Sequence, residues 1–145
     1  MQKLNEADEQ RVVRAIANAE RGNRGEVRVH LEAKCPTPDP VQRARALYVK
    51  LKLDRTRDDT AVLLYVAPRS KVCAVWSGAG LHARPDAGFW KSVTDAVANR
   101  SKEGRLADGL CDALGLIGEL LRKHVPGEDA AGNELPNTIS TESSS

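Results

Sequence analysis

The chain has 145 residues, of which 41% are hydrophobic and 29% are charged, and its formal net charge is +2. This length and composition are typical of one soluble globular domain, and the small net charge favours no class of charged partner. Aromatic residues make up only 3% of the chain, so the core is predicted to be aliphatic and the few rings are conspicuous. No apolar run reaches the roughly 18 residues that a membrane-spanning helix needs.

The cysteines and the first residues indicate where the protein acts. The opening sequence MQKLNEADEQ is polar and acidic, unlike a secretory signal. Cys35, Cys73 and Cys111 stand far apart and form no Cys-x-x-Cys pair. This spacing is typical of reduced thiols rather than of a disulfide framework or a zinc site. A cytoplasmic location is therefore expected.

The chain begins with a predicted helix and a predicted strand. Asn5 is a suitable N-cap for a helix that ends near Gly22, with Val12 and Ile16 at helical spacing. Residues 26–32 then alternate strictly between apolar and polar. The polar face consists of Glu26, Arg28, His30 and Glu32. This face has two interpretations, the charged wall of a groove or a solvated edge strand.

A second helix is predicted after Asp39 and Pro40, an N-cap followed by proline at the first helical position. Its exposed side carries four basic residues, Arg43, Arg45, Lys50 and Lys52. Such a stripe can contact phosphates or another anionic surface. No aromatic platform or nucleic-acid motif accompanies it, so we expect a solvated helix face and no nucleic-acid partner.

A hairpin is predicted at the centre of the chain. Thr60–Ala67 is an unbroken apolar run, the pattern of a strand buried on both faces. Pro68, Arg69 and Ser70 supply a turn, and Lys71–Ser77 resumes with β-favouring residues. The following sequence, Gly78-Ala79-Gly80, is a weak candidate for a phosphate cradle. A turn that requires positive φ explains these glycines as well.

Two further helices and a polar tail complete the chain. Asp86 is predicted to open the third helix, and a fourth begins near Leu106. Residues 1–127 are predicted to form one domain. Residues 128–145 are predicted to be a polar tail, docked in part around the Leu135-Pro136 pair and then disordered.

The order of these elements predicts the fold class. The first two strands are separated by a helix, so we expect them to be parallel with a right-handed crossover. The third strand follows a tight turn and is expected to be antiparallel to the second. The prediction is a small α/β sandwich with a mixed sheet and about four helices. We expect a monomer.

The segments that carry this order resemble the TPM domain family. They are AIANAE and GEVRVHLE, then LKLDRTRDDTAVLLYVA and VWSGAGLH, then FW, LADGL and NELPNTIS. The resemblance implies a three-layer α/β/α fold. The family includes thylakoid-lumen proteins linked to photosystem repair with acid phosphatase activity, and membrane-anchored bacterial proteins. Some small bacterial members that resemble this chain bind calcium.

Two departures from the family pattern limit what the resemblance implies. The anchors and signals that are common in the family are missing here, so a membrane association is doubtful. The family often has Asn-Gly before its buried strand, where this chain has Asp59-Thr60.

Four carboxylates are predicted to gather at one rim of the sheet. The first strand begins at Glu26, and the second follows Asp58 and Asp59. The third strand finishes at the same end and leads through residues 78–82 to Asp86. Calcium requires several oxygen ligands, so these four residues are the candidate metal ligands. This rim is the amino end of the parallel strands, whereas open α/β sheets usually bind ligands at the carboxyl ends. Asp108 and Asp112 are expected at the opposite end.

The residues do not support any familiar phosphatase mechanism. No cysteine has an arginine six residues later, no Asp-x-Asp pair follows a strand, and the three histidines are isolated. Ser77 lacks the preceding glycine of a nucleophile elbow. Catalysis would therefore depend on a bound metal and its water.

Three hypotheses follow from these observations. The first is a non-catalytic accessory module that binds a divalent cation, calcium, and acts on an unidentified protein partner, such as a membrane protein or complex. The second is a metal-dependent acid phosphatase at the same rim. The third is an interaction module that docks through its basic second helix.

Overall fold

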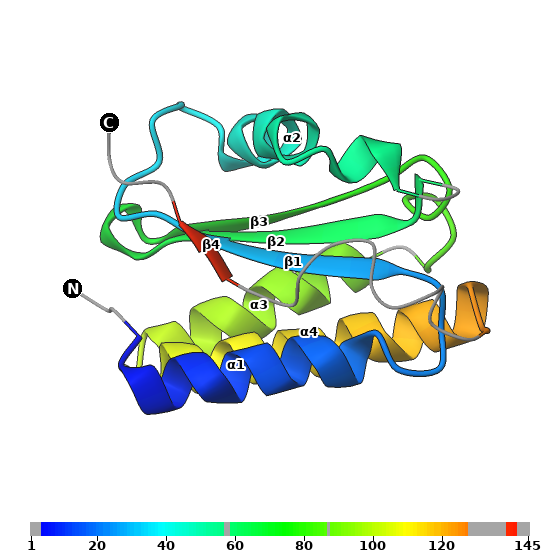
Figure 1. Ribbon diagram of the computed structural model, residues 1–145. Coiled ribbons are helices and arrows are strands. Elements are labelled where there is room, and N and C mark those ends of the chain that lie inside the picture. Colours follow the sequence, from blue (N-terminus) through cyan, green and yellow to red (C-terminus); the bar gives the residue numbers. More distant parts are fainter. Residues whose placement is uncertain (1–3, 57–58, 87, 128–138, 142–145) are drawn as a thin grey trace.

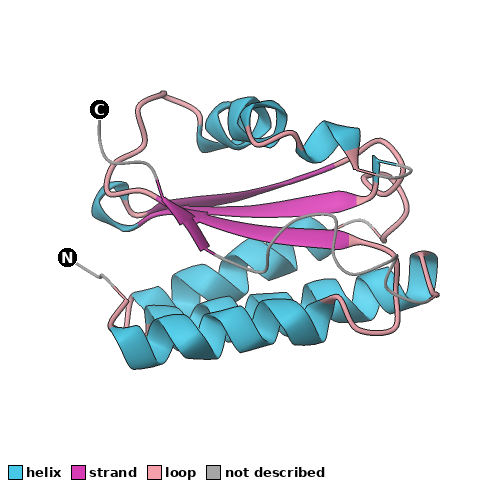
Figure 2. Ribbon diagram, in the orientation of Figure 1, coloured by secondary structure: helices cyan, strands magenta, loops and turns pink. Residues whose placement is uncertain are grey.

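The computed structural model describes residues 4–56, 59–86, 88–127 and 139–141. These residues form three layers, in which one helix covers one face of a sheet and three helices cover the other (Figures 1 and 2). The helices are α1 (Glu6–Ala19), α2 (Pro40–Lys50), α3 (Phe89–Ser101) and α4 (Leu106–His124). The strands are β1 (Glu26–Leu31), β2 (Ala61–Ala67), β3 (Val72–Ser77) and β4 (Ile139–Thr141). The predicted α/β/α sandwich with a small mixed sheet and four α-helices is confirmed.

The sheet has the strand order β3-β2-β1-β4. β1 is parallel to β2, with Glu26 opposite Ala61, and β3 is antiparallel to β2, with Ser77 opposite Val62. The parallel and antiparallel pairs agree with the prediction. The first residues of β1 and β2 and the last residue of β3 therefore lie at one end of the sheet, which we call the rim.

The core has two parts because β2 is buried on both faces. Val62, Leu64 and Val66 face α1, α3 and α4, where Leu110, Leu114 and Ile117 of α4 are also fully buried. Leu63 and Tyr65 face α2 and pack with Leu47 and Tyr48. The apolar run of β2 thus supplies both layers, as its sequence predicted.

The polar face of β1 is buried, so the prediction of a solvated edge strand is wrong. Glu26, Arg28, His30 and Glu32 are each at most 9% exposed. The reason is that β1 is an inner strand, because β4 pairs with it in parallel at Val29–Leu31. Tyr65 and Arg43 bond Glu32, and His30 stacks on the Tyr65 ring.

The start of α3 also differs from the prediction. The helix begins at Phe89, and its N-cap is Gly88 with φ 89°, whereas Asp86 lies three residues earlier and accepts the Phe89 amide through its backbone carbonyl. The backbone must adopt a left-handed conformation where it enters α3. Glycine adopts this conformation more easily than aspartate does. Asp86 is therefore free of the capping role that its sequence position suggested.

β4 was not predicted as a strand. Ile139 packs on the core that faces α1, and Ser140 lies 2.8 Å from His30, measured from its Oγ to Nδ1. Residues 139–141, the described part of the chain after residue 127, are therefore docked as an added strand. The predicted docking around Leu135 and Pro136 lies outside the described residues. Across the part of the chain that is described, no helix is long and apolar enough to cross a membrane.

We expect that ending the chain at Gly127 lowers the melting temperature by a few degrees, a loss on the order of 1 kcal/mol. The truncation removes the β4 pairing and leaves the β1 edge and His30 without their β4 partners. Thermal unfolding followed by circular dichroism measures the change, with a chain that ends at Thr141 as the control. Equal melting temperatures for the Gly127 truncation and the full chain would show that β4 adds no stability.

Candidate functional site

The rim is built around Asp59, which precedes β2. Asp59 has φ 51° and is half-buried, and the loop that follows β3 lies against it. Its two carboxylate oxygens accept different donors: Oδ1 accepts the Tyr48 hydroxyl at 2.8 Å, and Oδ2 accepts the Ala79 amide at 2.9 Å. Its backbone carbonyl accepts the Gly80 amide at 3.1 Å. Asp59 thus joins α2, β2 and the loop after β3.

Tyr48 holds its proton firmly in this arrangement. Burial raises the pKa of the Tyr48 hydroxyl, and the hydrogen bond to Asp59 raises it further. The hydroxyl therefore remains a hydrogen-bond donor to Asp59 over the whole physiological pH range. Tyr48 positions the carboxylate and does not act as a base.

Gly78 is required at the rim because a side chain has no room there. A Cβ atom at this position would collide with the Asp59 carbonyl and carboxylate and would lie 2.5 Å from the Tyr48 hydroxyl. Gly78 is not among the glycines with positive φ. The prediction that these glycines serve a positive-φ turn is therefore wrong for Gly78, which serves a close approach instead.

The loop amides are occupied by the protein itself. Gly78 donates to the Ala61 carbonyl at 3.1 Å, and Leu81 and His82 donate to the Gly78 carbonyl at 3.0 and 2.9 Å. The Ala79 and Gly80 amides bond Asp59. A phosphate cradle needs amides that point at the ligand. In this conformation the loop offers none from 78 to 82, so it is an Asp59 clamp and not a phosphate cradle.

A row of rings borders the clamp. The His82 ring lies between Trp76 and Trp90, with centroids 5.7 and 6.3 Å away, and Phe89 meets Trp90 edge-on at 5.0 Å. The Trp90 indole donates to the His82 carbonyl at 3.1 Å, and the guanidinium of Arg45 lies 5.7 Å from the Trp76 centroid. This row was not predicted from the sequence. The sequence did contain one indication of it, the scarcity of aromatic residues. Tyr48 and three of these rings lie together at one end of the fold, so the few aromatic residues mark this end.

Ser77 and His82 form a polar pair within this row. Ser77 Oγ lies 3.1 Å from His82 Nδ1, and Ser77 is buried whereas His82 is exposed. A serine beside a histidine is the first element of a nucleophile site. The described residues place no carboxylate on the other nitrogen of His82 to orient the ring, so the pair is incomplete as a catalytic group.

The predicted metal ligands are only partly together. Glu26 begins β1 at the same end as Asp59 but is 6% exposed. Asp86 is exposed and lines a different hollow, of about 190 Å³, with Glu119 and His124 of α4. Asp58 lies outside the described residues. In the part of the chain that the structure describes, no three His, Cys, Asp or Glu side chains are close enough to hold a metal ion.

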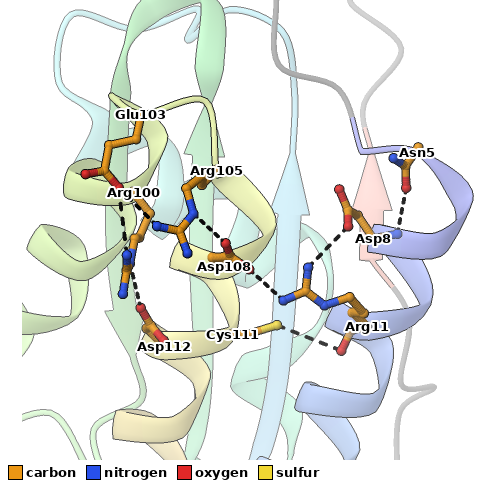
Figure 3. Close-up of polar contacts among 9 residues, drawn as sticks. All are labelled: Asn5, Asp8, Arg11, Arg100, Glu103, Arg105, Asp108, Cys111 and Asp112. Atoms are coloured by element: carbon orange, nitrogen blue, oxygen red, sulfur yellow. Dashed lines mark hydrogen bonds and ion pairs between the residues drawn. The ribbon is translucent and has the colours of Figure 1, made fainter.

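Asp108 and Asp112 lie at the other end of the molecule, as predicted. Figure 3 shows them in a chain of alternating charges: Arg11 Nη2 contacts Asp108 at 2.6 Å, and Arg100 Nε contacts Asp112 at 3.2 Å. Arg105 bonds the second oxygen of Asp108 at 2.8 Å. The hydrogen bonds from Arg11 and Arg105 lower the pKa of Asp108. These carboxylates are neutralised by arginines and join α1 to the α3–α4 connection.

Two arginines of the predicted basic stripe have separate roles, and Lys52 lies beyond the end of α2. Arg43 forms an ion pair with Glu32 through Nε and Nη2, each at 2.9 Å, and Arg45 lies over Trp76. The absence of an aromatic platform beside this helix was one reason to dismiss a binding role. The structure places Trp76 there, so that reason does not hold.

Comparisons with known proteins agree with the fold. The family model for the TPM domain matches residues 2–120. The solution structure of the BA42 protein from the psychrophilic bacterium Bizionia argentinensis is 34% identical, with a TM-score of 0.86 over 98% of this chain and all of that one. A search of curated proteins found no match.

Two more distant structures share the fold alone. The N-terminal domain of the cg2496 protein from Corynebacterium glutamicum is 9% identical, with a TM-score of 0.66 over 92% of this chain and 84% of that one. The N-terminal domain of a P. gingivalis protein is 17% identical, with a TM-score of 0.65 over 84% of this chain and 78% of that one. Both support the three-layer architecture.

Proposed function

Because this chain belongs to the TPM domain family, we propose that it is a non-catalytic accessory module that binds a divalent cation, calcium, at the rim around Asp59. The observation that carries the proposal is the state of the Asp59 carboxylate. It is half-buried and fixed by two neutral donors, Tyr48 and Ala79, and it forms no ion pair within the described residues. A fixed carboxylate without a cationic partner favours a cation.

Two other carboxylates, Glu32 and Asp108, differ from Asp59 because cationic side chains hold them. Glu32 is paired with Arg43, and Asp108 is paired with Arg11 and Arg105. Each oxygen of Asp59 accepts one hydrogen bond and keeps a second lone pair, so the carboxylate fits a hard cation. Glu26 stands at the same end of the sheet, and Asp86 lines a separate hollow. The proposal therefore rests on Asp59, with Asp58 as its neighbour in sequence.

A site with few charged ligands binds calcium weakly. We expect a dissociation constant on the order of 0.1–1 mM, the range of calcium sites with low ligand charge. At about ten times the dissociation constant, calcium should stabilise the fold by about 1.4 kcal/mol. The protein would act through a partner rather than through chemistry of its own.

Calcium titration of the metal-stripped protein, followed by amide NMR, tests the proposal. We expect shifts confined to the amides of Asp59, Ala79 and Gly80 and a rise in melting temperature. Asp59→Asn keeps the shape and removes the charge, so it should abolish both effects. Asp108→Asn is the matched control and should leave the calcium response intact, because Asp108 lies at the far end.

Two results would contradict the cation site. Shifts concentrated around Asp108 and Asp112 would show that calcium binds at the end of the fold opposite to the rim. An unchanged spectrum at millimolar calcium would remove the metal proposal altogether.

The alternative, a metal-dependent phosphatase at the same rim, has one supporting observation, the contact between Ser77 and His82. It predicts that the protein hydrolyses an activated aryl phosphate and that a chelator abolishes this activity. The Asp59→Asn and Ser77→Ala variants should also lack the activity. The occupied loop amides weigh against it. Turnover that survives all three changes would come from a contaminant.

A further inference from the structure

A cavity of about 430 Å³ opens at the end of β3 that lies away from the rim. It lies between Val72 and Cys73, the first residues of β3, and the end of α3, from Val97 to Ser101, with the C-cap Lys102. Its volume is within the range of pockets that bind small molecules, roughly 300–1,000 Å³. Neither the rim nor the family assignment explains it.

The interior of this cavity is apolar. Val66, Val72, Val97 and Ala98 contribute aliphatic groups to its lining. The Cys73 thiol donates to the Thr94 carbonyl at 3.4 Å, and burial raises its pKa to about 11. The thiol is therefore protonated at neutral pH and lines the cavity as a neutral group rather than as a nucleophile.

The charged residues in the cavity lining are both lysines. Lys71 and Lys102 are exposed and belong to its lining, which contains no carboxylate. Neither lysine forms an ion pair with any residue of the described ranges. The nearby Asp95 is paired with Lys91 at 2.8 Å. Two cations at an apolar cavity complement a ligand with an apolar body and an anionic head.

The end of α3 does not oppose an anion here. A helix C-terminus usually presents unpaired carbonyls, whose partial negative charge repels anions. The carbonyl of Ala98 accepts the Lys102 amide at 3.1 Å, and that of Ser101 accepts the Gly104 amide at 3.0 Å. The last turn is thus closed by its own connection, so these two carbonyls are not free to repel an anion beside Lys71 and Lys102.

We propose that this cavity binds a small amphipathic monoanion, of the class of medium-chain carboxylates. The alkyl chain would lie against Val66, Val97 and Ala98, and the carboxylate would contact Lys71 and Lys102. A peptide that adds to the β3 edge fits less well, because only Val72 and Cys73 of that strand line the cavity. For a ligand of this size we expect a dissociation constant on the order of 1 mM.

Cys73 is a reporter of occupancy. In a Cys35→Ser/Cys111→Ser variant, Cys73 is the only thiol, and its alkylation rate can be followed by mass spectrometry. Octanoate at about five times its dissociation constant leaves about one sixth of the protein unoccupied, so it should slow alkylation about sixfold, since bound ligand covers the thiol. Octylammonium, which has the same chain and the opposite charge, should give little protection.

Substitutions test separately the role of the two lysines and the role of the apolar cavity. Lys71→Glu/Lys102→Glu changes only exposed positions and should abolish protection by octanoate, whereas Arg14→Glu on α1 should preserve it. Ala98→Phe should fill the cavity and abolish protection by blocking the chain. Equal protection by octanoate and octylammonium, or octanoate shifts in amide NMR away from Val72, Ala98 and Ser101, would overturn the proposal.

Discussion

Replacing Arg43 with methionine should lower the free energy of unfolding by about 3 kcal/mol, the lower end of the cost of breaking a buried ion pair. Arg43 bonds both oxygens of Glu32 at 2.9 Å and joins α2 to β1. The side chains of Arg43 and Glu32 are 18% and 6% exposed, so the pair is largely withdrawn from water. Without the guanidinium, Glu32 keeps the Tyr65 hydroxyl but loses its opposite charge.

Urea unfolding of the wild type and of Arg43→Met measures this loss. Arg45→Met is the matched control, because Arg45 is exposed on the same helix, lies over the face of Trp76 and forms no ion pair with any described residue. It should cost at most about 1 kcal/mol. A loss below that value for Arg43→Met would show that the Glu32 ion pair is not a major source of stability.

The same pair predicts a dependence on pH. Burial raises the pKa of Glu32, but the hydrogen bonds from Arg43 and Tyr65 outweigh it, and the net pKa in the folded protein is lowered from 4.5. Ionised Glu32 therefore stabilises the fold above the unfolded-state pKa, and this contribution is lost as pH falls through the folded-state pKa. The difference between the wild type and Arg43→Met should shrink below pH 4.5. A constant difference down to pH 3, about one unit below the ordinary glutamate pKa, would contradict the assignment.

The second large effect is expected at the rim. Gly78→Ala should lower the free energy of unfolding by at least about 2 kcal/mol, because forced overpacking displaces backbone. The new Cβ would meet the Asp59 carbonyl, which is part of the main chain and cannot rotate away. The Asp59 clamp would open, so the calcium response should fall together with stability.

Gly115→Ala is the control for this substitution. Gly115 is exposed within α4 and no atom lies within 4 Å of its added Cβ. Alanine there should stabilise the helix by up to about 1 kcal/mol. If Gly78→Ala unfolds at the same urea concentration as the wild type, the loop relaxes freely and Gly78 is not required for close packing.

Local sequence was sufficient for the elements whose signals are local. The Asn5 side chain accepts the Asp8 amide at 2.7 Å and begins α1, as its position indicated. The apolar run of β2 is buried on both faces, and the helix between β1 and β2 makes those strands parallel. These features depend on periodicity, capping and chain direction, which neighbouring residues specify on their own.

The burial of the charged face of β1 could not be predicted from local sequence. Alternation predicted two faces correctly, but the burial of the polar face depends on β4, which joins β1 from the far end of the chain. A three-residue strand in a polar segment has no periodicity that sequence analysis can detect. Glu32 is tolerable inside only because Arg43 and Tyr65 reach it from other elements.

The rim was also predictable only in part. Sequence and topology alone placed Glu26 and Asp59 at one end of the sheet and Asp108 and Asp112 at the other, because strand direction determines which ends meet. Only the tertiary structure showed that the Asp59 carboxylate is held by two neutral donors, Tyr48 and Ala79, and by no cationic partner within the described residues. That outcome depends on side chains from α2 and from the loop after β3, whose meeting at Asp59 requires the whole sheet to be assembled.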